Sequence, residues 1–217
     1  MTDFEHARKI MVDNQLRTSG ITDRRLLAAM GEVPRELFVP AVRRELAYID
    51  EAQPLNATRR MAPPAPFAKL VQLAAIEHTD RVLDLGCGTG YSTAVLARLG
   101  AQVVAVEEDA GLAAEARRRL AGLGVGNAQV VEGSFTTAAA SAGPYDVIVI
   151  EGSMTEVPDA VLAQLKPEGR LVVTIQPKGR PGVANLFARS GKGVAATAAF
   201  DARLPPLEHG VDDAFVF

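Results

Sequence analysis

Two regions of the chain place their apolar residues at different spacings. In residues 3–47 the apolar positions recur at the spacing of helical turns, which is typical of amphipathic helices that bury one face. These positions include Ile10, Leu16, Leu26, Leu27 and Met30. Asp23 precedes the second group and is a residue type that caps helix starts. The pattern predicts a helical N-terminal region.

The stretch from residue 50 to residue 66 shows no such period. It contains four prolines, Pro54, Pro63, Pro64 and Pro66. Because proline lacks an amide donor and has a fixed φ, a group of prolines interrupts both helices and strands. We expect an irregular loop over the surface or over a cleft, long enough to carry functional residues.

From residue 67 onward, short apolar runs alternate with amphipathic segments. The predicted strands cover residues 81–85, 102–107, 128–132, 145–150 and 170–175, and the predicted helices cover residues 68–76, 91–99, 111–121 and 158–165. Such alternation is typical of a parallel sheet covered by helices. Weaker β-like segments at residues 193–200 and 213–217 would add an antiparallel edge. The expected fold class is α/β, a Rossmann-like doubly wound and mostly parallel sheet with an N-terminal helical extension.

The most distinctive motif ends the first of these strands. Residues 82–90 read Val-Leu-Asp-Leu-Gly-Cys-Gly-Thr-Gly, and Gly86, Gly88 and Gly90 allow the backbone to pass close to a ligand. A dinucleotide turn has the different spacing G-x-G-x-x-G and binds phosphate, which Asp84 would repel. Asp84 suits a cationic or hydroxyl-bearing group. The motif therefore predicts S-adenosylmethionine as cofactor, the alternative being a tight turn without a ligand.

Further candidate contacts to this cofactor follow the later strands. Glu107 ends the second strand, where its carboxylate would accept hydrogen bonds from ribose hydroxyls. Gly133, Ser134 and Phe135 follow the third strand and would face the adenine, with Phe135 stacking on it; a turn and a core aromatic are the alternative. Glu151 follows the fourth strand and would border the transfer site, or else only solvate the rim of the sheet.

These assignments divide the chain into two parts. We expect residues 1–66 to form the helical region and a substrate-side loop. We expect residues 67–217 to form the Rossmann-like domain that binds S-adenosylmethionine.

The composition of the chain argues against several classes of binding partner. The 217 residues include 23 lysines and arginines and 26 acidic residues, a net charge of −3, so no basic field favours nucleic acid. The one cysteine, Cys87, supports neither a disulfide framework nor a multi-cysteine zinc site, and no metal is expected. No segment has the uninterrupted apolar length of a membrane span, and no signal peptide is evident. We expect a cytoplasmic protein without membrane or nucleic-acid partners. The sequence does not indicate an oligomeric state.

Several motifs resemble those of known enzymes. The glycine turn, together with Lys166-Pro167-Glu168-Gly169, resembles class I S-adenosylmethionine-dependent methyltransferases. A narrower similarity is to protein-L-isoaspartate O-methyltransferases. The segments that carry it are Asp13-Asn14-Gln15-Leu16-Arg17, Gly20-Ile21, Val33-Pro34-Arg35-Glu36-Leu37-Phe38-Val39-Pro40, Pro144-Tyr145-Asp146, Glu156-Val157-Pro158 and Leu204-Pro205-Pro206-Leu207. The resemblance implies an O-methyltransferase that methylates a carboxylate on a protein or peptide, with repair of isoaspartyl residues as the family's activity.

The chain departs from that family on the substrate side. The family's loop reads like Leu-Pro-Ile-Gly-x-Gly-Gln-Thr-Ile-Ser-x-Pro, whereas this chain has Arg60 at the threonine and Ala62 at the serine. Two hydroxyls beside the family's substrate are therefore absent. The family's Val-Thr-Ala-Ala becomes residues 150–153, with Glu151 at the threonine, and its Gly-Asp-Gly near adenine becomes residues 133–135.

Methyl transfer to a carboxylate depends mainly on alignment, because the acceptor oxygen is already anionic. Arg59 or Arg60 would pair with such a carboxylate, or else would form a solvated basic pair. If the acceptor is instead a hydroxyl or an amine, Glu151 or His209 would act as base, although a lone turn histidine is more often a surface residue. Arg60 and Glu151 are therefore the candidates for catalysis.

Three functions fit the sequence. The first is a carboxyl methyltransferase acting on proteins or peptides, and the second is a methyltransferase of the same fold with a changed substrate. The third is a non-catalytic module that binds S-adenosylmethionine or a partner. Fold alone does not choose among them.

Overall fold

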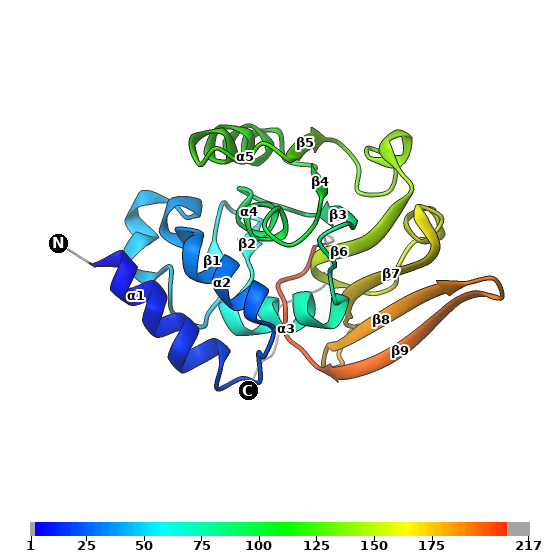
Figure 1. The fold of residues 1–217 in the computed structure, drawn as a ribbon, viewed down its shortest axis with the longest axis horizontal. Helices are drawn as coiled ribbons and strands as arrows, with labels where there is room; N and C mark the ends of the chain where they lie inside the picture. Colours follow the sequence, from blue (N-terminus) through cyan, green and yellow to red (C-terminus); the bar gives the residue numbers. More distant parts are fainter. Residues whose placement is uncertain (1–2, 208–217) are drawn as a thin grey trace.

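A seven-stranded sheet forms the centre of the molecule (Figure 1). The computed structural model describes residues 3–207, and within them the strand order is β5-β4-β3-β6-β7-β8-β9. The parallel strands are β3 (Arg81–Leu85), β4 (Gln102–Glu107), β5 (Ala128–Glu132), β6 (Tyr145–Met154) and β7 (Leu165–Ile175). The antiparallel edge consists of β8 (Val183–Ser190) and β9 (Gly193–Asp201). A separate hairpin pairs β1 (Gln53–Pro54) with β2 (Arg60–Met61).

Both faces of the parallel strands are buried, which explains why these strands read as nearly continuous apolar runs. Neighbouring residues of a strand point to opposite faces, so that Val82 belongs to one buried cluster and Leu83 to the other. The first face is covered by α3 (Pro64–Ala74), α4 (Tyr91–Leu96) and α5 (Ala110–Gly122). The second face is covered by α6 (Asp159–Leu162) and by residues 133–142, which include a short 3₁₀ turn, Ala140–Ala142.

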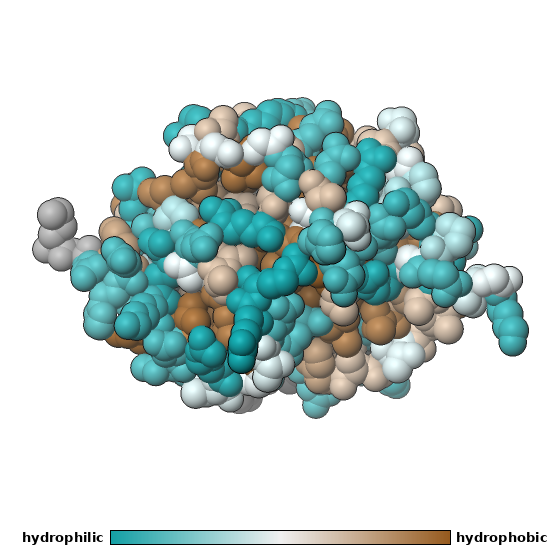
Figure 2. Space-filling model, viewed as in Figure 1, coloured by the Kyte–Doolittle hydropathy of each residue, from teal (hydrophilic) through white to brown (hydrophobic). Residues whose placement is uncertain are grey.

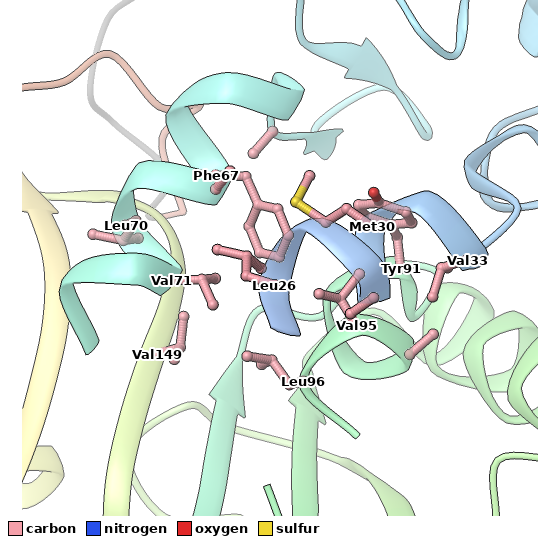
Figure 3. Close-up of a cluster of buried hydrophobic side chains, with 14 of the residues drawn as sticks. Leu26, Met30, Val33, Phe67, Leu70, Val71, Tyr91, Val95, Leu96 and Val149 are labelled. Atoms are coloured by element: carbon pink, nitrogen blue, oxygen red, sulfur yellow. The ribbon is translucent and has the colours of Figure 1, made fainter. Parts of the chain in front are cut away.

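The N-terminal region is helical and packs on the first face. Its elements are α1 (Phe4–Ile10), the π-helical η1 (Met11–Leu16), α2 (Arg24–Glu32) and the 3₁₀ segments η2 (Arg35–Phe38) and η3 (Ala41–Leu46). Asp23 caps α2 by accepting hydrogen bonds from the amides of Arg25 at 2.8 Å and Leu26 at 3.2 Å. Figure 3 shows Leu26 and Met30 of α2 beside Phe67 of α3 and Val95 of α4, in one continuous core.

The expected fold class is confirmed, and all five predicted parallel strands are present. The predicted strand at residues 193–200 is β9, but its partner is β8. The other segment expected at this edge, residues 213–217, lies outside the described residues. The division at residue 66 stays a prediction, since the same hydrophobic cluster includes residues from both sides of it.

Element boundaries differ from the prediction in several places. Helix α3 begins at Pro64 rather than at residue 68, because a proline is well tolerated in the first turn, where its missing amide has no partner to lose. The expected irregular loop therefore ends earlier, and it includes the hairpin of β1 and β2. Helices α4 and α6 are shorter than predicted, and β7 begins at Leu165 because that residue already pairs with Tyr145 of β6.

The surface is mixed in character. Figure 2 shows hydrophilic residues over most of the face in view, with apolar residues between them. None of the helices in the described residues combines the length and the apolar character that crossing a bilayer requires.

Candidate active site

The candidate site lies where the strand order of the sheet reverses. The chain proceeds from β3 to β4 and β5 on one side, and then returns to β6 on the other side of β3. The loops that leave the carboxyl ends of β3 and β6 therefore diverge, and ligands of open α/β sheets bind in the crevice between such loops. The glycine turn, Glu107 and Glu151 all lie at this end of the sheet.

The glycine turn connects β3 to α4 through three residues of positive φ. The φ angles are +83° at Gly86, +56° at Gly88 and +93° at Gly90, values that glycine adopts without steric cost. Gly86 and Gly88 border a cavity, whereas Gly90 does not. A Cβ at Gly90 would lie 3.2 Å from the Cβ of Ala116, so this glycine serves the close approach of α4 to α5. The structure thus places the predicted ligand contact Gly90 in the packing between helices.

Asp84 is fully buried at the end of β3. Its Oδ2 accepts hydrogen bonds from the hydroxyls of Ser92 at 2.8 Å and Thr93 at 2.7 Å. Its Oδ1 is buried and has no hydrogen-bond partner among the described residues. Burial, reinforced by the negative charge of Glu107, raises the pKa of Asp84 to about 7, against the effect of the two hydroxyls. Ser92 and Thr93 were not among the predicted site residues.

Glu107 is also buried, and it is paired with an arginine. Its Oε2 accepts a hydrogen bond from the amide of Gly88 at 2.7 Å and another from Nη2 of Arg59 at 2.9 Å. The same Nη2 donates to the carbonyl of Gly86 at 2.9 Å, and the guanidinium carbon lies 5.7 Å from the centroid of the Phe135 ring. Arg59, which we considered as a partner of a substrate carboxylate, therefore contacts the predicted cofactor side.

The segment after β5 places one of its predicted residues toward the site and one toward solvent. Phe135 is 8% exposed, and its amide donates to Oε1 of Glu108 at 3.1 Å. Ser134 is exposed, and its hydroxyl lies 2.9 Å from that of Thr136. Gly133 has a φ of +144° and starts this turn. Of Gly133, Ser134 and Phe135, it is therefore Phe135 whose side chain lies at the site.

A small cavity of about 20 Å³ lies beside the glycine turn, enough for about one water molecule. Its lining residues are Arg35, Leu55, Arg60, Met61, Ala62, Phe67, Gly86, Cys87, Gly88, Thr89, Tyr91, Ser92 and Glu151. Glu151 is half-buried on β6, and its Oε1 has no partner within the described part of the chain. Burial and the charge of Asp84 raise the pKa of Glu151 well above its usual value, although Arg59 and Arg35 act in the opposite direction.

The N-terminal motif around Arg35 reaches this site. Arg35 is completely buried and donates hydrogen bonds to the carbonyls of Ala47 and Ala62, both at 2.6 Å. Thr89 of the glycine turn donates to the carbonyl of Phe38 at 2.5 Å. The segment that resembles the isoaspartyl enzymes therefore anchors the hairpin and the glycine turn. Its role could not be derived from residue spacing, because these partners lie far apart in the sequence.

The C-terminal part of the described chain also reaches the turn. The amide of Ser153 donates to the carbonyl of Pro205, and the amide of Leu207 donates to that of Ser153, both at 2.9 Å. This pairing places Leu207 against Gly86. His209 lies outside the described residues.

Arg60 borders the cavity from the hairpin, but its side chain is exposed. Cys87 is buried within the turn, and burial raises the pKa of its thiol well above the usual value. In the described residues no group of three or more histidine, cysteine or acidic side chains is arranged to hold a metal.

The sheet order and this site together define a class of protein. A mostly parallel seven-stranded sheet, a glycine turn after β3 and buried acids at the ends of β3 and β4 are the features of a Rossmann-like S-adenosylmethionine-dependent methyltransferase. The family model of protein-L-isoaspartate(D-aspartate) O-methyltransferases matches residues 6–204. The chain belongs to this family, whose members are S-adenosylmethionine-dependent O-methyltransferases.

Similar sequences agree with this membership. A protein-L-isoaspartate O-methyltransferase of Methylorubrum extorquens is 40% identical over 187 residues, which cover 86% of this chain and 82% of that protein. One from Koribacter versatilis is 37% identical over 210 residues, covering 95% of this chain and 93% of that protein.

Solved structures are similar as well. A protein-L-isoaspartate O-methyltransferase with 27% identity superposes on 95% of this chain with a TM-score of 0.79, and the chain spans 66% of that protein. A Plasmodium falciparum beta-aspartate methyltransferase in complex with S-adenosyl-L-homocysteine superposes on 96% of this chain with a TM-score of 0.78. At 18% identity, the second comparison supports the fold alone.

Proposed function

We propose that this protein transfers a methyl group from S-adenosylmethionine to a carboxylate of a protein or peptide, with isoaspartyl residues as the substrate. The observation that carries the proposal is the family match over residues 6–204, which covers the helical region as well as the cofactor side. We also infer a cytoplasmic location, with no nucleic-acid partner, from the charge and composition of the chain.

The residue types at the glycine turn fit the cofactor. Asp84 offers a buried acceptor atom that has no partner in the described chain, and Glu107 offers a carboxylate at the end of the next strand. Gly86 and Gly88 lack the Cβ atoms that would narrow the crevice. Asp84 would accept hydrogen bonds from a cationic or hydroxyl-bearing group, and Glu107 from ribose hydroxyls. When bound, S-adenosylmethionine supplies a methyl group on a positively charged sulfonium.

Arg60 and Glu151 would act on the acceptor. Arg60 borders the cavity on the side of the hairpin and would align a carboxylate by a bidentate contact. Glu151 has a raised pKa, so its protonated form would donate a hydrogen bond to the acceptor carboxylate instead of repelling it. These contacts would replace the two hydroxyls that the family's loop supplies. These residues then contribute by aligning the acceptor carboxylate with the methyl group, since the acceptor oxygen needs no deprotonation.

The test is a comparison of two peptides that differ in one linkage. Formation of S-adenosylhomocysteine is measured with an isoaspartyl peptide and with the same peptide carrying a normal aspartyl residue. We expect product with the isoaspartyl peptide and at least tenfold less with the aspartyl one. Equal rates with both peptides would contradict isoaspartyl specificity.

A changed acceptor is the second candidate function. It is favoured by Arg60, Ala62 and Glu151, which border the same cavity and differ from the family's loop and strand residues. This candidate predicts that the protein binds S-adenosylhomocysteine but forms no product with the isoaspartyl peptide. A third outcome, binding without turnover on any carboxylate acceptor, would indicate a module that only binds the cofactor.

A further inference from the structure

The side chain of Arg59 lies where the proposed function requires a ligand. The proposed ribose contact is Glu107, and the proposed adenine contact is Phe135. Arg59 forms an ion pair with Glu107 at 2.9 Å and lies over the Phe135 ring at 5.7 Å. Both partners are buried, with side-chain exposures of 11% for Arg59 and 1% for Glu107, so solvent screens this pair little.

We propose that Arg59 is an internal competitor of the cofactor and sets the affinity of the site for it. The inference rests on the proposed function, because it uses the assignment of Glu107 and Phe135 to the adenosine. It adds a residue that determines cofactor affinity and that is absent from the predicted contacts.

The acceptor capacity of Glu107 supports this competition. A carboxylate offers about four acceptor positions. Three are used, by Nη2 of Arg59, by the amide of Gly88 and by the amide of Asp109, the last at 3.1 Å to Oε1. A ribose with two adjacent hydroxyls needs two acceptor positions, and the contacts within residues 3–207 leave one of the four. Release of Arg59 provides the second.

The hairpin that carries Arg59 is closed over the turn by further contacts. Nδ2 of Asn56 donates to Oδ2 of Asp109 at 2.9 Å, and the amide of Leu55 donates to the carbonyl of Arg59 at 2.9 Å. Leu55 lies against the turn, since a Cβ at Gly88 would be 2.7 Å from its Cδ1. The remaining cavity of about 20 Å³ is far below the several hundred Å³ of a typical small-molecule site. Cofactor entry therefore requires this hairpin to move away.

The apparent affinity for a ligand falls with the fraction of molecules in the open state. Each interaction that holds Arg59 in place lowers this fraction. Removing the guanidinium should therefore strengthen cofactor binding, whereas a residue that bound the cofactor directly would weaken it when removed. The two roles therefore predict opposite changes in cofactor affinity when the guanidinium is removed.

The experiment is calorimetric titration of the full chain with S-adenosylhomocysteine, which reads binding without turnover. The variants are Arg59→Gln, which removes the guanidinium and keeps a polar side chain, and Arg44→Gln as the matched control. Arg44→Gln removes the same charge from an exposed residue of η3 that does not line the cavity. We expect about tenfold tighter binding for Arg59→Gln and less than a twofold change for Arg44→Gln.

Arg59→Lys provides a second variant that keeps the charge beside Glu107. A lysine keeps the charge beside Glu107 but lacks the planar guanidinium that lies over the Phe135 ring, so the affinity of Arg59→Lys for the ligand should lie between those of the wild type and Arg59→Gln. Thermal melts without ligand establish that each variant is folded.

The outcomes separate the two proposals. Weaker or unchanged binding by a folded Arg59→Gln, with binding by the wild type, would overturn the competitor role and leave the cofactor assignment standing. Binding by Arg59→Gln with none by the wild type would support the competition strongly. No binding by any folded variant would overturn the cofactor assignment, and the competitor role with it.

Discussion

At the scale of single residues, the site concentrates carboxyl groups in a buried volume. Asp84, Glu107 and Glu151 lie at one end of the sheet, and the guanidiniums of Arg59 and Arg35 are the cations that act on them. Removing a charge from water is costly unless it is paired. The ion pair with Arg59 offsets this cost for Glu107, whereas the donors to Asp84 within residues 3–207 are two hydroxyl groups. Asp84 is therefore a residue kept at the expense of stability.

We predict that Asp84→Asn stabilises the ligand-free protein at pH 8 and weakens cofactor binding. The asparagine oxygen can still accept from Ser92 and Thr93, and the buried charge is gone. Because the folded-state pKa of Asp84, about 7, is above its unfolded value of 3.8, its cost is complete above pH 7. The cost declines as pH falls toward 4. We expect Tm to rise by roughly 2–4 °C at pH 8, the effect of about 1 kcal/mol in a chain of this size.

The measurement is a series of thermal melts between pH 5 and pH 8. The difference between variant and wild type should shrink as the pH falls, since the folded wild type then takes up the proton. The control is Asp159→Asn, at an exposed position. A gain in Tm that is equal at pH 5 and pH 8 would contradict a buried, ionised Asp84.

At the scale of elements, the helical region and the hairpin differ in how they are held. Helix α2 is fixed by apolar burial, because Leu26 and Met30 lie in the core beside Phe67 and Val95 (Figure 3). The tip of the hairpin is held by polar contacts, of Arg59 to Glu107 and to the carbonyl of Gly86 and of Asn56 to Asp109, whereas Met61 at its base is buried in the core. Polar contacts can be exchanged for those of a ligand, but buried apolar area cannot be exposed without a large cost. The tip of the hairpin is therefore the segment suited to open.

We predict that Leu26→Ala destabilises the whole protein. The side chain is completely buried, and truncation of such a leucine costs about 2–5 kcal/mol through lost burial and the cavity left behind. Urea unfolding measures this cost. Val42→Ala, in the same region but at a residue that is 89% exposed, should change stability by less than about 0.5 kcal/mol. A small effect of Leu26→Ala would show that α2 is not part of the cooperative core.

At the scale of the whole molecule, Arg35 connects parts of the chain that are distant in the sequence. Its guanidinium bonds to carbonyls before and after the hairpin, at Ala47 and Ala62, and lies 4.7 Å over the ring of Tyr91 in α4. Desolvation lowers the pKa of Arg35, a sign of how completely it is enclosed. The helical region, the hairpin and the glycine turn are thereby held in one arrangement.

We predict that Arg35→Lys lowers stability by roughly 2–3 kcal/mol, although the charge is kept. A lysine cannot donate to two separated carbonyls with fixed planar geometry, so at least one buried carbonyl loses its partner. Urea unfolding of Arg35→Lys is compared with that of Arg24→Lys, an exposed arginine of α2. Equal stabilities for the two variants would mean that Arg35 does not join these elements.

Much of the fold follows from local pattern. The five parallel strands were predictable because strands buried on both faces are short apolar runs, and the antiparallel β9 was also foreseen. The ends of α3, α4 and β7 were not, because pairing and capping partners decide where an element stops. The acids and glycines of the turn were recognisable from their spacing alone. The spacing did not indicate toward which part of the site each side chain would point.

The sequence by itself determined the fold class, the glycine turn and the two acids at the ends of β3 and β4, because each follows from local patterns along the chain. The tertiary structure decided that Gly90 serves helix packing, that Ser134 is exposed, and that Arg59 forms an ion pair with Glu107. Those outcomes depend on long-range contacts, such as the 48 residues that separate Arg59 from Glu107. The local sequence around Arg59 does not reveal that it will contact Glu107, because folding of the chain brings these two charges together.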